Sequence, residues 1–391
     1  MSDTSSIHIG LIAPEFPPEL GGVQTYSCEL AAALARSGAR VTVLAPALRP
    51  GEAAPPAPAG VSIHRDLKLS RKHDAGLLAR HPEVQAWHGL TANCAWLINA
   101  TRLPVFLSIH GNDLLSPTGA FHRPAWRKRL HLPFGSRAEY WWSLHRGRAH
   151  LANALRRGSA IFCNSNFTAS LTRERSTLPK ERIIVTGIGL GEDYVNLPQT
   201  TRHAADGPVR FITVSRLDEP RKNIDLVLRA LALLPAGSAW VYTVIGAGHR
   251  LDEFKSLAAS LGLSGKVEFT GALPRTELIN RLQSADLFVL TPSVDDRSVE
   301  GFGIVYLEAN ACGLPVLAAC TGGVPDAVQE GVSGWLIDGP SAQTIADALR
   351  RFLNAPASFD RDACRRHALR FTWDAVAARC LEAYTGPGSR S

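Results

Sequence analysis

Two glutamates, Glu300 and Glu308, flank the start of a predicted helix late in the chain. Glu300 opens the run E-G-F-G-I-V-Y-L-E, in which Gly303 stands just before helical spacing that extends from Ile304 to Cys312. A helix that begins beside glycine leaves backbone N–H groups and the positive end of its dipole free, which suits a phosphate. The spacing of the two glutamates alone says little, and solvated carboxylates on a well-capped unit are the alternative.

Two cations, Arg216 and Lys222, lie between a predicted strand and the next predicted helix, earlier in the second half of the chain. Arg216 follows the predicted strand Phe211–Val214, and Lys222 comes just before the next helix. Arginine and lysine at a strand end and a helix start could clamp a diphosphate, although surface charge is the usual role of these residues. Gly246 and Gly248 follow another predicted strand, where the lack of side chains lets another group approach the backbone closely.

The first half holds a second set of candidate residues. The predicted strand Ile7–Ala13 is followed by Gly21 and Gly22 and then by a helix, which again favours an anion, with a plain tight turn as the alternative. No G-x-G-x-x-G motif occurs, which counts against an NAD or FAD oxidoreductase. His110 and Asp113 follow the predicted strand Val105–Ile109, whose carboxyl end should face a ligand crevice, although a lone histidine is usually structural.

Predicted strands alternate with predicted helices along the chain, which indicates an α/β fold with parallel sheets. A polar, aperiodic stretch with two prolines and a glycine around residues 196–208 is typical of a linker, and the chain length allows two domains. We therefore expect a first domain over 1–196, a linker over 197–208, a second domain over 209–371 and a final helix over 372–391.

The net charge of +7 is carried by the first half of the chain. Residues 1–200 hold 22 Lys/Arg against 14 Asp/Glu, whereas the remainder holds 20 against 21, so the first half should meet an acidic partner. The seven cysteines are scattered without C-x-x-C spacing, which predicts reduced thiols and neither a zinc site nor a disulfide framework. The start M-S-D-T-S-S lacks a basic region, so we expect a cytoplasmic protein without a signal peptide or a membrane-spanning helix.

The segment 122–157 is strongly basic and aromatic, with nine Lys/Arg, a single acid and interleaved Trp, Tyr and Phe. This composition suits an anionic membrane surface, where aromatic rings lie at headgroup depth. A nucleic acid and a solvated helical hairpin are the alternatives. We favour peripheral binding to the inner face of the cytoplasmic membrane, and we expect no nucleic-acid partner.

Taken together, the motifs resemble glycosyltransferase family 4, strongly over Phe211–Asp338 and more weakly in the first half. The run V-E-G-F-G-I-V-Y-L-E-A, the P-R-K before the helix and F-P-P-E-L-G-G-V-Q are similar to GDP-mannose-dependent mannosyltransferases that act on phosphatidylinositol mannosides. The resemblance implies the GT-B architecture: two facing Rossmann-like domains, with the last helix crossing back to the first. The sequence departs from the family at Asn223, commonly glycine, and in a longer loop before Glu300.

The resemblance also implies roles. Arg216 and Lys222 would stabilise the leaving diphosphate, Glu300 would hold sugar hydroxyls, and His110 would contact the 6-hydroxyl at the reaction centre. Glu308 would hold the ribose. The remaining residues expected to bind the nucleotide sugar share positions in the glycine-containing loops: Gly21, Gly22, Asp113, Gly246, Gly248, Leu273, Phe302, Gly303 and Ile304. No D-x-D motif occurs where metal-dependent relatives place theirs, so we expect neither metal nor cofactor.

The predicted function is retaining transfer of a hexose, with mannose from GDP-mannose as first choice, to a glycan or lipid-linked acceptor. A UDP-sugar donor is the alternative within the family. Other classes are another GT-B enzyme, such as an epimerase or phosphorylase, and a non-catalytic nucleotide-sugar-binding module. Together, His110, Glu300 and Glu308 argue against the module.

Overall fold

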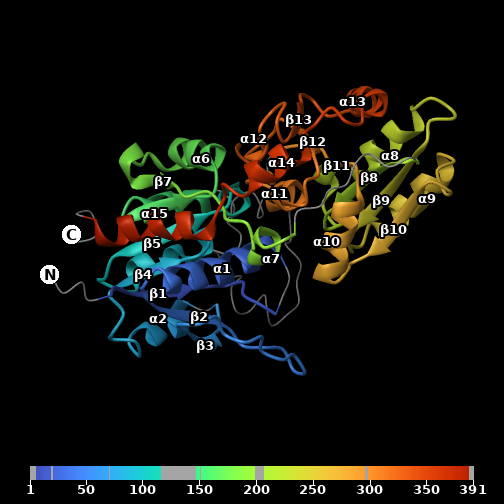
Figure 1. Ribbon diagram of the computed structural model, residues 1–391. Helices are drawn as coiled ribbons and strands as arrows, with labels where there is room; N and C mark the ends of the chain where they lie inside the picture. Colours follow the sequence, from blue (N-terminus) through green and yellow to red (C-terminus); the bar gives the residue numbers. More distant parts are fainter. Residues whose placement is uncertain are drawn as a thin grey trace, which may run out of the picture. The chain divides into compact units, whose positions relative to one another are not determined.

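The computed structural model describes residues 6–18, 21–69, 71–115, 147–149, 151–198, 207–295 and 298–386. The chain forms two compact units (Figure 1). Unit 1 comprises residues 1–189 and 372–391, and unit 2 comprises residues 190–371. Most of the basic segment 122–157 lies outside the described residues.

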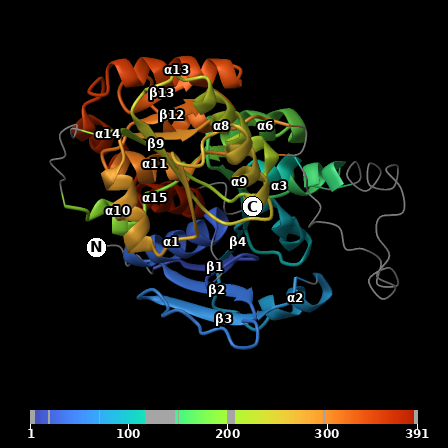
Figure 2. The ribbon, with the colours of Figure 1, turned by 90° about the vertical axis from the view of Figure 1, so that its right-hand side faces the viewer.

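Unit 1 is built on a seven-stranded sheet in the order β3-β2-β1-β4-β5-β6-β7, and all its pairings are parallel. Figure 2 shows β3, β2, β1 and β4 following one another in this order. The central strands are buried along their whole length, as expected when helices cover both faces of a parallel sheet. The strands are β1 (His8–Ile12), β2 (Arg40–Pro46), β3 (Val61–Leu67), β4 (Ala86–Gly89), β5 (Val105–Ile109), β6 (Ala160–Cys163) and β7 (Ile183–Val185).

Helices of unit 1 come from both ends of the chain. The last helix, α15, lies beside α1, and Arg36 of α1 donates to Asp374 of α15 at 2.9 Å (Figure 1). The described helices and 3₁₀ turns are α1 (Gly22–Arg36), α2 (Arg71–Leu78), η1 (Ala92–Asn99), α3 (Asn112–Leu115), α6 (Asn166–Ser176), η3 (Lys180–Arg182) and α15 (Trp373–Thr385).

Unit 2 has a six-stranded sheet in the order β10-β9-β8-β11-β12-β13, again with parallel pairings throughout. The expectation of parallel sheets in an α/β fold is therefore confirmed in both units. The strands are β8 (Val209–Val214), β9 (Trp240–Ile245), β10 (Val267–Gly271), β11 (Leu287–Leu290), β12 (Val316–Ala319) and β13 (Gly334–Ile337).

The helices of unit 2 follow its strands. In α13, the Ser341 hydroxyl accepts from the Thr344 N–H and the Thr344 hydroxyl accepts from the Ser341 N–H, a capping box that fixes the helix start. The described helices and turns are α7 (Glu192–Val195), η4 (Pro220–Lys222), α8 (Ile224–Ala232), α9 (Leu251–Ser260), α10 (Arg275–Ser284), α11 (Ile304–Ala311), α12 (Val324–Ala327), α13 (Ala342–Asn354) and α14 (Arg361–Ala368).

The first domain boundary differs from the expected one. The chain leaves unit 1 after Gly189, earlier than the expected end at residue 196. The physical reason is that α7 packs on α11 and buries Tyr194 within unit 2, contacts that a polar sequence around residue 196 does not reveal. Most of the expected linker, residues 199–206, lies outside the described residues. Within the described part of the chain, no helix is long and apolar enough to cross a bilayer.

Candidate active site

In each sheet the strand order reverses beside one strand. In unit 1 the order runs outward from β1 through β2 on one side and through β4 on the other. In unit 2 the order runs outward from β8 through β9 on one side and through β11 on the other. Ligands of open parallel sheets bind beyond the carboxyl ends of strands at such switch points. The predicted site residues Arg216 and Glu300 follow β8 and β11, and His110 follows β5, next to β4.

Unit 2 carries an alternating chain of charges past β8. Arg216 donates to Oε1 of Glu219 at 3.0 Å, and Oε2 of the same glutamate forms an ion pair with Nη2 of Arg221 at 2.6 Å. Nη1 of Arg221 donates to Oε2 of Glu300 at 3.3 Å, and Lys222 donates to that same oxygen. The predicted clamp residues Arg216 and Lys222 are thus connected through Glu219, Arg221 and Glu300.

Glu300 is held as a carboxylate anion. Burial by itself would raise the pKa of Glu300, but Lys222 and Arg221 outweigh burial and lower that pKa below its usual value. Its backbone is fixed too, because the N–H of Gly323 donates to the Glu300 carbonyl at 2.8 Å. A charged acceptor is therefore available at the carboxyl end of β11.

The helix α11 starts as the glycine run predicts. Gly303 is its N-cap with φ 90°, and a Cβ there would lie 2.4 Å from the ring of Tyr306. Glycine is required on both counts. Among the described residues, no side chain caps this helix end, which leaves the first N–H groups of α11 without a side-chain acceptor there. Phe302 is buried against Phe371 and Ile304 is half-buried, and the predicted contact of these two residues with the nucleotide sugar stays a prediction.

Glu308 lies on α11 beside Arg275 of α10. The guanidinium donates to Oε1 of Glu308 at 2.9 Å and covers the ring of Tyr194 at 5.3 Å. Burial raises the pKa of Glu308, and the charge of Arg275 only partly opposes this effect. Leu273 is half-buried and precedes Arg275 in the turn after β10. The sequence did not single out Arg275 or Tyr194.

Gly246 and Gly248 lie against the backbone of another loop of unit 2. A Cβ at Gly246 would lie 1.8 Å from the Ser215 carbonyl oxygen, and one at Gly248 would lie 2.4 Å from the Leu217 carbonyl carbon. The group that approaches these glycines is therefore the loop carrying Arg216. Their direct contact with a nucleotide sugar stays a prediction.

In unit 1, Asp113 positions two loops. Its Oδ2 accepts from the N–H of Ala92 at 2.9 Å, and its Oδ1 accepts from the N–H of His110 at 3.0 Å. Nε2 of His110 lies 2.9 Å from the Leu90 carbonyl oxygen, which can only accept. Nε2 thus carries a proton, and in the neutral ring Nδ1 is the acceptor. The structure gives Asp113 a positioning role, whereas its predicted contact with the donor stays a prediction.

Gly21 and Gly22 form the start of α1, as predicted. α1 begins at Gly22, and Gly21 is its N-cap in an extended conformation. A Cβ at Gly21 would lie 2.3 Å from Oε1 of Gln24. The N-cap residue of α1 makes no side-chain cap, and the first turn of the helix contains no acid. No carboxylate of that turn would therefore repel the anion that this helix start is predicted to bind.

A buried hydrogen-bond network lies behind His110. Nδ1 of His88 lies 2.7 Å from Oη of Tyr384, and Nε2 lies 2.8 Å from Oγ of Ser108. Ser108 in turn lies 2.9 Å from Oη of Tyr26, whose ring meets the His110 ring edge-on at 4.6 Å. Sequence reasoning missed all four residues of the network, because their partners are far apart in the chain. The one available signal was a histidine in the short stretch A-W-H-G.

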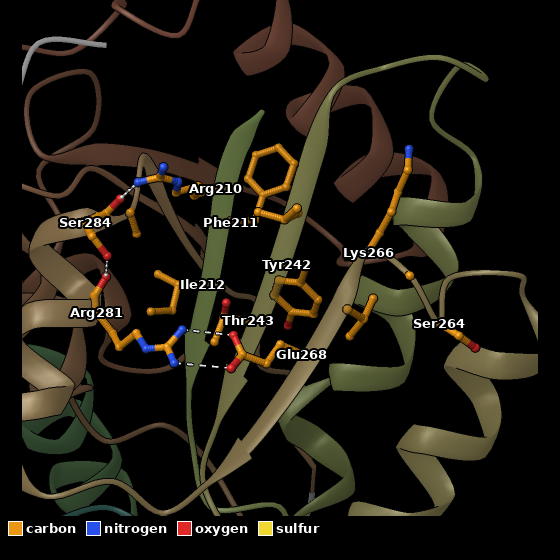
Figure 3. A pocket seen from close by; sticks show the side chains of 14 residues that line it. Arg210, Phe211, Ile212, Tyr242, Thr243, Ser264, Lys266, Glu268, Arg281 and Ser284 are labelled. Atoms are coloured by element: carbon orange, nitrogen blue, oxygen red, sulfur yellow. Dashed lines mark hydrogen bonds and ion pairs between the residues drawn. The ribbon is translucent and has the colours of Figure 1, made fainter. Parts of the chain in front are cut away.

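A pocket of about 430 Å³ lies elsewhere in unit 2, on the amino-terminal half of β8, β9 and β10 (Figure 3). Figure 3 shows Arg281 facing Glu268, with contacts of 2.9 and 3.2 Å, while Arg210 donates to the Ser284 carbonyl. None of the predicted site residues lines this pocket. The predicted residues lie at the opposite, carboxyl ends of the strands. Among the described residues, no cluster of three His, Cys, Asp or Glu could hold a metal ion.

Two parallel-sheet units with candidate residues at both switch points define an α/β protein of the GT-B class. Residues 20–190 match the family model of Glycosyltransferase Family 4, and residues 200–369 match that of Glycosyl transferases group 1. The chain belongs to these glycosyltransferases, which confirms the resemblance found in its motifs.

Curated relatives and solved structures agree with this assignment. The chain is 28% identical to a GDP-mannose-dependent alpha-(1-6)-phosphatidylinositol monomannoside mannosyltransferase of Mycobacterium tuberculosis, over 96% of this chain and 97% of the relative. It is 38% identical to a D-inositol 3-phosphate glycosyltransferase of Mycolicibacterium smegmatis, over 43% and 38%. Its fold is similar to Anabaena Alr3699/HepE in complex with UDP and glucose, with TM-score 0.69, 19% identity and coverage of 96% and 98%. It is also similar to sucrose-phosphate synthase from Thermosynechococcus elongatus, with TM-score 0.74, 20% identity and coverage of 97% and 98%.

Proposed function

We propose that this glycosyltransferase moves mannose from GDP-mannose to a glycan or lipid-linked acceptor, with retention at the anomeric carbon and without a metal ion. The observation that carries the proposal is the charge chain from Arg216 to Lys222 at the switch point of unit 2. The full-length similarity to a GDP-mannose-dependent mannosyltransferase supports the donor.

The chemistry follows from the charge that develops when the bond between the sugar and the diphosphate breaks. The leaving diphosphate gains negative charge while the sugar becomes oxocarbenium-like. Lys222, Arg216 and the open N–H groups of α11 supply positive potential for the leaving group. Attack on the same face places the acceptor hydroxyl beside the leaving phosphate oxygen, which takes its proton as the new glycosidic bond forms.

The carboxylates and the histidine orient the sugar. Glu300 is an ionised acceptor for sugar hydroxyls, and Glu308 is an acceptor for the ribose. His110 carries its proton on Nε2, so Nδ1 can accept a hydrogen bond from the 6-hydroxyl. None of these groups needs to act as a nucleophile.

We also propose that the enzyme works on an anionic membrane surface, bound through the basic and aromatic segment 122–157. The support is compositional: nine Lys/Arg, one acid and several aromatic residues. A lipid-linked acceptor would be met on the same surface.

A UDP-sugar is the second candidate donor. Its support is the similarity of the fold to a structure solved with UDP and glucose. Thermal-shift measurements with GDP-mannose, UDP-glucose, UDP-N-acetylglucosamine and ADP-glucose separate the candidates, because a ligand that binds only the folded state raises the melting temperature. We expect the largest shift with GDP-mannose. Release of nucleoside diphosphate only when acceptor is present marks a transferase, whereas donor binding without release marks a binding module.

A further inference from the structure

Arg221 is the central member of the charge chain, and it is the most buried. Its side chain is 5% exposed, against 13% for Lys222 and 72% for Arg216. Arg221 contacts both carboxylates of the charge chain, Glu219 and Glu300. Nothing in the proposed reaction uses it, because a guanidinium so enclosed is poorly placed to meet an incoming diphosphate.

Several contacts fix Arg221 in place. Nε donates to Oγ of Ser298 at 2.6 Å, and the Arg221 carbonyl accepts from the N–H of Ser293 at 2.7 Å. The next residues support the same arrangement, since Asn223 donates to the Thr291 carbonyl and to Oγ of Ser293, each at 2.7 Å. The short turn that carries Lys222 is therefore tied to both sides of the loop that leads to Glu300.

Two anions compete for the ammonium group of Lys222: the Glu300 carboxylate and the diphosphate of the proposed reaction. In the structure Lys222 contacts Glu300, yet the proposed function requires its charge at the leaving diphosphate. A carboxylate left with no other cation would hold Lys222 or become protonated, since a buried charge needs a partner. Arg221 contacts the same oxygen of Glu300 and is anchored independently of Lys222.

We propose that Arg221 is a positioning residue that keeps Glu300 charged and oriented, so that Lys222 is free to bind phosphate. The proposal rests on the proposed function, in which Lys222 meets the diphosphate. Among the residues that the structure describes, the charged or titratable groups that face Glu300 are Arg221 and Lys222 of η4 and the Tyr306 hydroxyl of α11. Of these, the two cations set its charge.

The test uses inorganic pyrophosphate binding by calorimetry, which needs neither sugar nor acceptor. We expect Arg221→Met to weaken pyrophosphate binding at neutral pH by about tenfold, because Lys222 is then held by Glu300. Adding Glu300→Gln to that variant should restore the affinity, because the competing carboxylate is gone. Arg281→Met removes an equal charge from an ion pair that lies away from the site, and it should leave the affinity unchanged.

Two results would overturn the proposal. One is an unchanged affinity in a folded Arg221→Met variant, and the other is a loss that Glu300→Gln does not relieve, which would make Arg221 a direct phosphate ligand. If Arg221→Met does not fold, Lys222→Met gives the answer by carbon-detected NMR of the Glu300 carboxyl. With Arg221 intact, that carboxyl should still titrate below the ordinary range of glutamate, and titration at or above that range would refute the proposal.

The outcome is separable from that of the proposed function. Restored pyrophosphate binding in the double variant, together with no turnover of any nucleotide sugar by the unaltered enzyme, would leave the role of Arg221 standing and refute the proposed transfer reaction. Turnover of a donor with no coupling between Arg221 and Glu300 would support the proposed function and refute the positioning role of Arg221. The two substitutions form a double-mutant cycle, in which coupling is read from the departure from additivity.

Discussion

Nδ1 of His88 and Oη of Tyr384 lie 2.7 Å apart, although 296 residues separate them in the chain. The contact joins the middle of the unit 1 sheet to its last helix. Tyr384 also meets the ring of Phe106 edge-on at 4.9 Å, so the helix is fixed by both polar and apolar contacts. A neutral imidazole suits this site, because it donates from one nitrogen and accepts at the other.

This contact predicts an acid-sensitive unit 1. Burial lowers the pKa of His88 from 6.5 to about 3, so between these values the unfolded chain binds a proton that the folded chain does not. Stability should therefore fall as the pH falls from 6.5 toward 3, by at most about 1.4 kcal/mol per pH unit. Hydrogen exchange of the β4 and β5 amides, measured across this range, checks the slope.

The control for this prediction is a histidine on the surface. His88→Gln should remove most of the slope, although it lowers stability at neutral pH. His249→Gln replaces an exposed residue of unit 2 and should leave the slope in unit 1 intact. A slope that survives His88→Gln would contradict the assignment.

The roles proposed for Lys222 and His110 predict different kinetic losses. Lys222→Ala should weaken nucleoside diphosphate binding and lower turnover together, because the phosphate charge exists in the ground state and grows in the transition state. His110→Ala should lower turnover by on the order of 10²-fold with little change in nucleotide affinity. Calorimetry with GDP, followed by steady-state kinetics, separates the two, and the opposite pattern would reverse the assignment.

Metal independence predicts that activity persists in EDTA. In the proposed mechanism, Arg216, Lys222 and the start of α11 supply the positive potential at the leaving group, and no metal charge is required. Initial rates with and without the chelator should agree. Full loss in EDTA that manganese or magnesium restores would overturn this part of the proposal.

Gly303→Ala should abolish donor binding. The new Cβ would lie 2.4 Å from the Tyr306 ring at a residue with φ 90°, so the start of α11 must move. The backbone strain alone is worth about 1 to 3 kcal/mol. Gly265→Ala has open space around it and no positive φ, so it should leave nucleotide binding and melting temperature nearly unchanged. Normal GDP affinity in Gly303→Ala would argue against the phosphate site at this helix start.

The membrane proposal predicts salt-sensitive binding to anionic vesicles. Each Lys or Arg near such a surface contributes about 1 kcal/mol, screened within a Debye length. Replacing Arg127, Lys128 and Arg129 with Glu should reduce co-sedimentation with anionic vesicles and leave GDP affinity unchanged. Equal binding to neutral and anionic vesicles at low salt would exclude the electrostatic mechanism.

Apolar strands were predictable from the sequence, and polar ones were not. The predicted strand Val105–Ile109 matches β5 residue for residue, and the predicted strand Ile7–Ala13 exceeds β1 by one residue at each end. Largely apolar runs of this kind are typical of a buried parallel sheet. β3 has the sequence V-S-I-H-R-D-L and lies at the sheet edge, where exposed polar residues are tolerated. β4 has the sequence A-W-H-G, which lacks a run of aliphatic or β-branched residues.

The helix start beside the candidate site was predictable, because local sequence determines it. Gly303 before the helical spacing indicated a start at Ile304, and the structure shows that start with φ 90° at Gly303. The phosphate expected at this position stays a prediction. The pairing of Arg221 with Glu300 spans 79 residues, and nothing local distinguishes Arg221 from a surface cation. The same holds for Arg275 with Glu308. Long-range partners decide which charged residues are buried, and one sequence does not contain them.

The position of α15 sets the order in which the protein can be completed during its synthesis. Unit 2 is one continuous segment, whereas unit 1 is assembled from the first 189 residues and the last 20. Because a chain emerges from the ribosome from its N-terminus, all of unit 2 is made before Tyr384 can reach His88. The half of the enzyme that is synthesised first is therefore the half that is finished last. Until then its sheet lacks the aromatic cover of α15, and transiently exposed apolar surface of this kind favours aggregation.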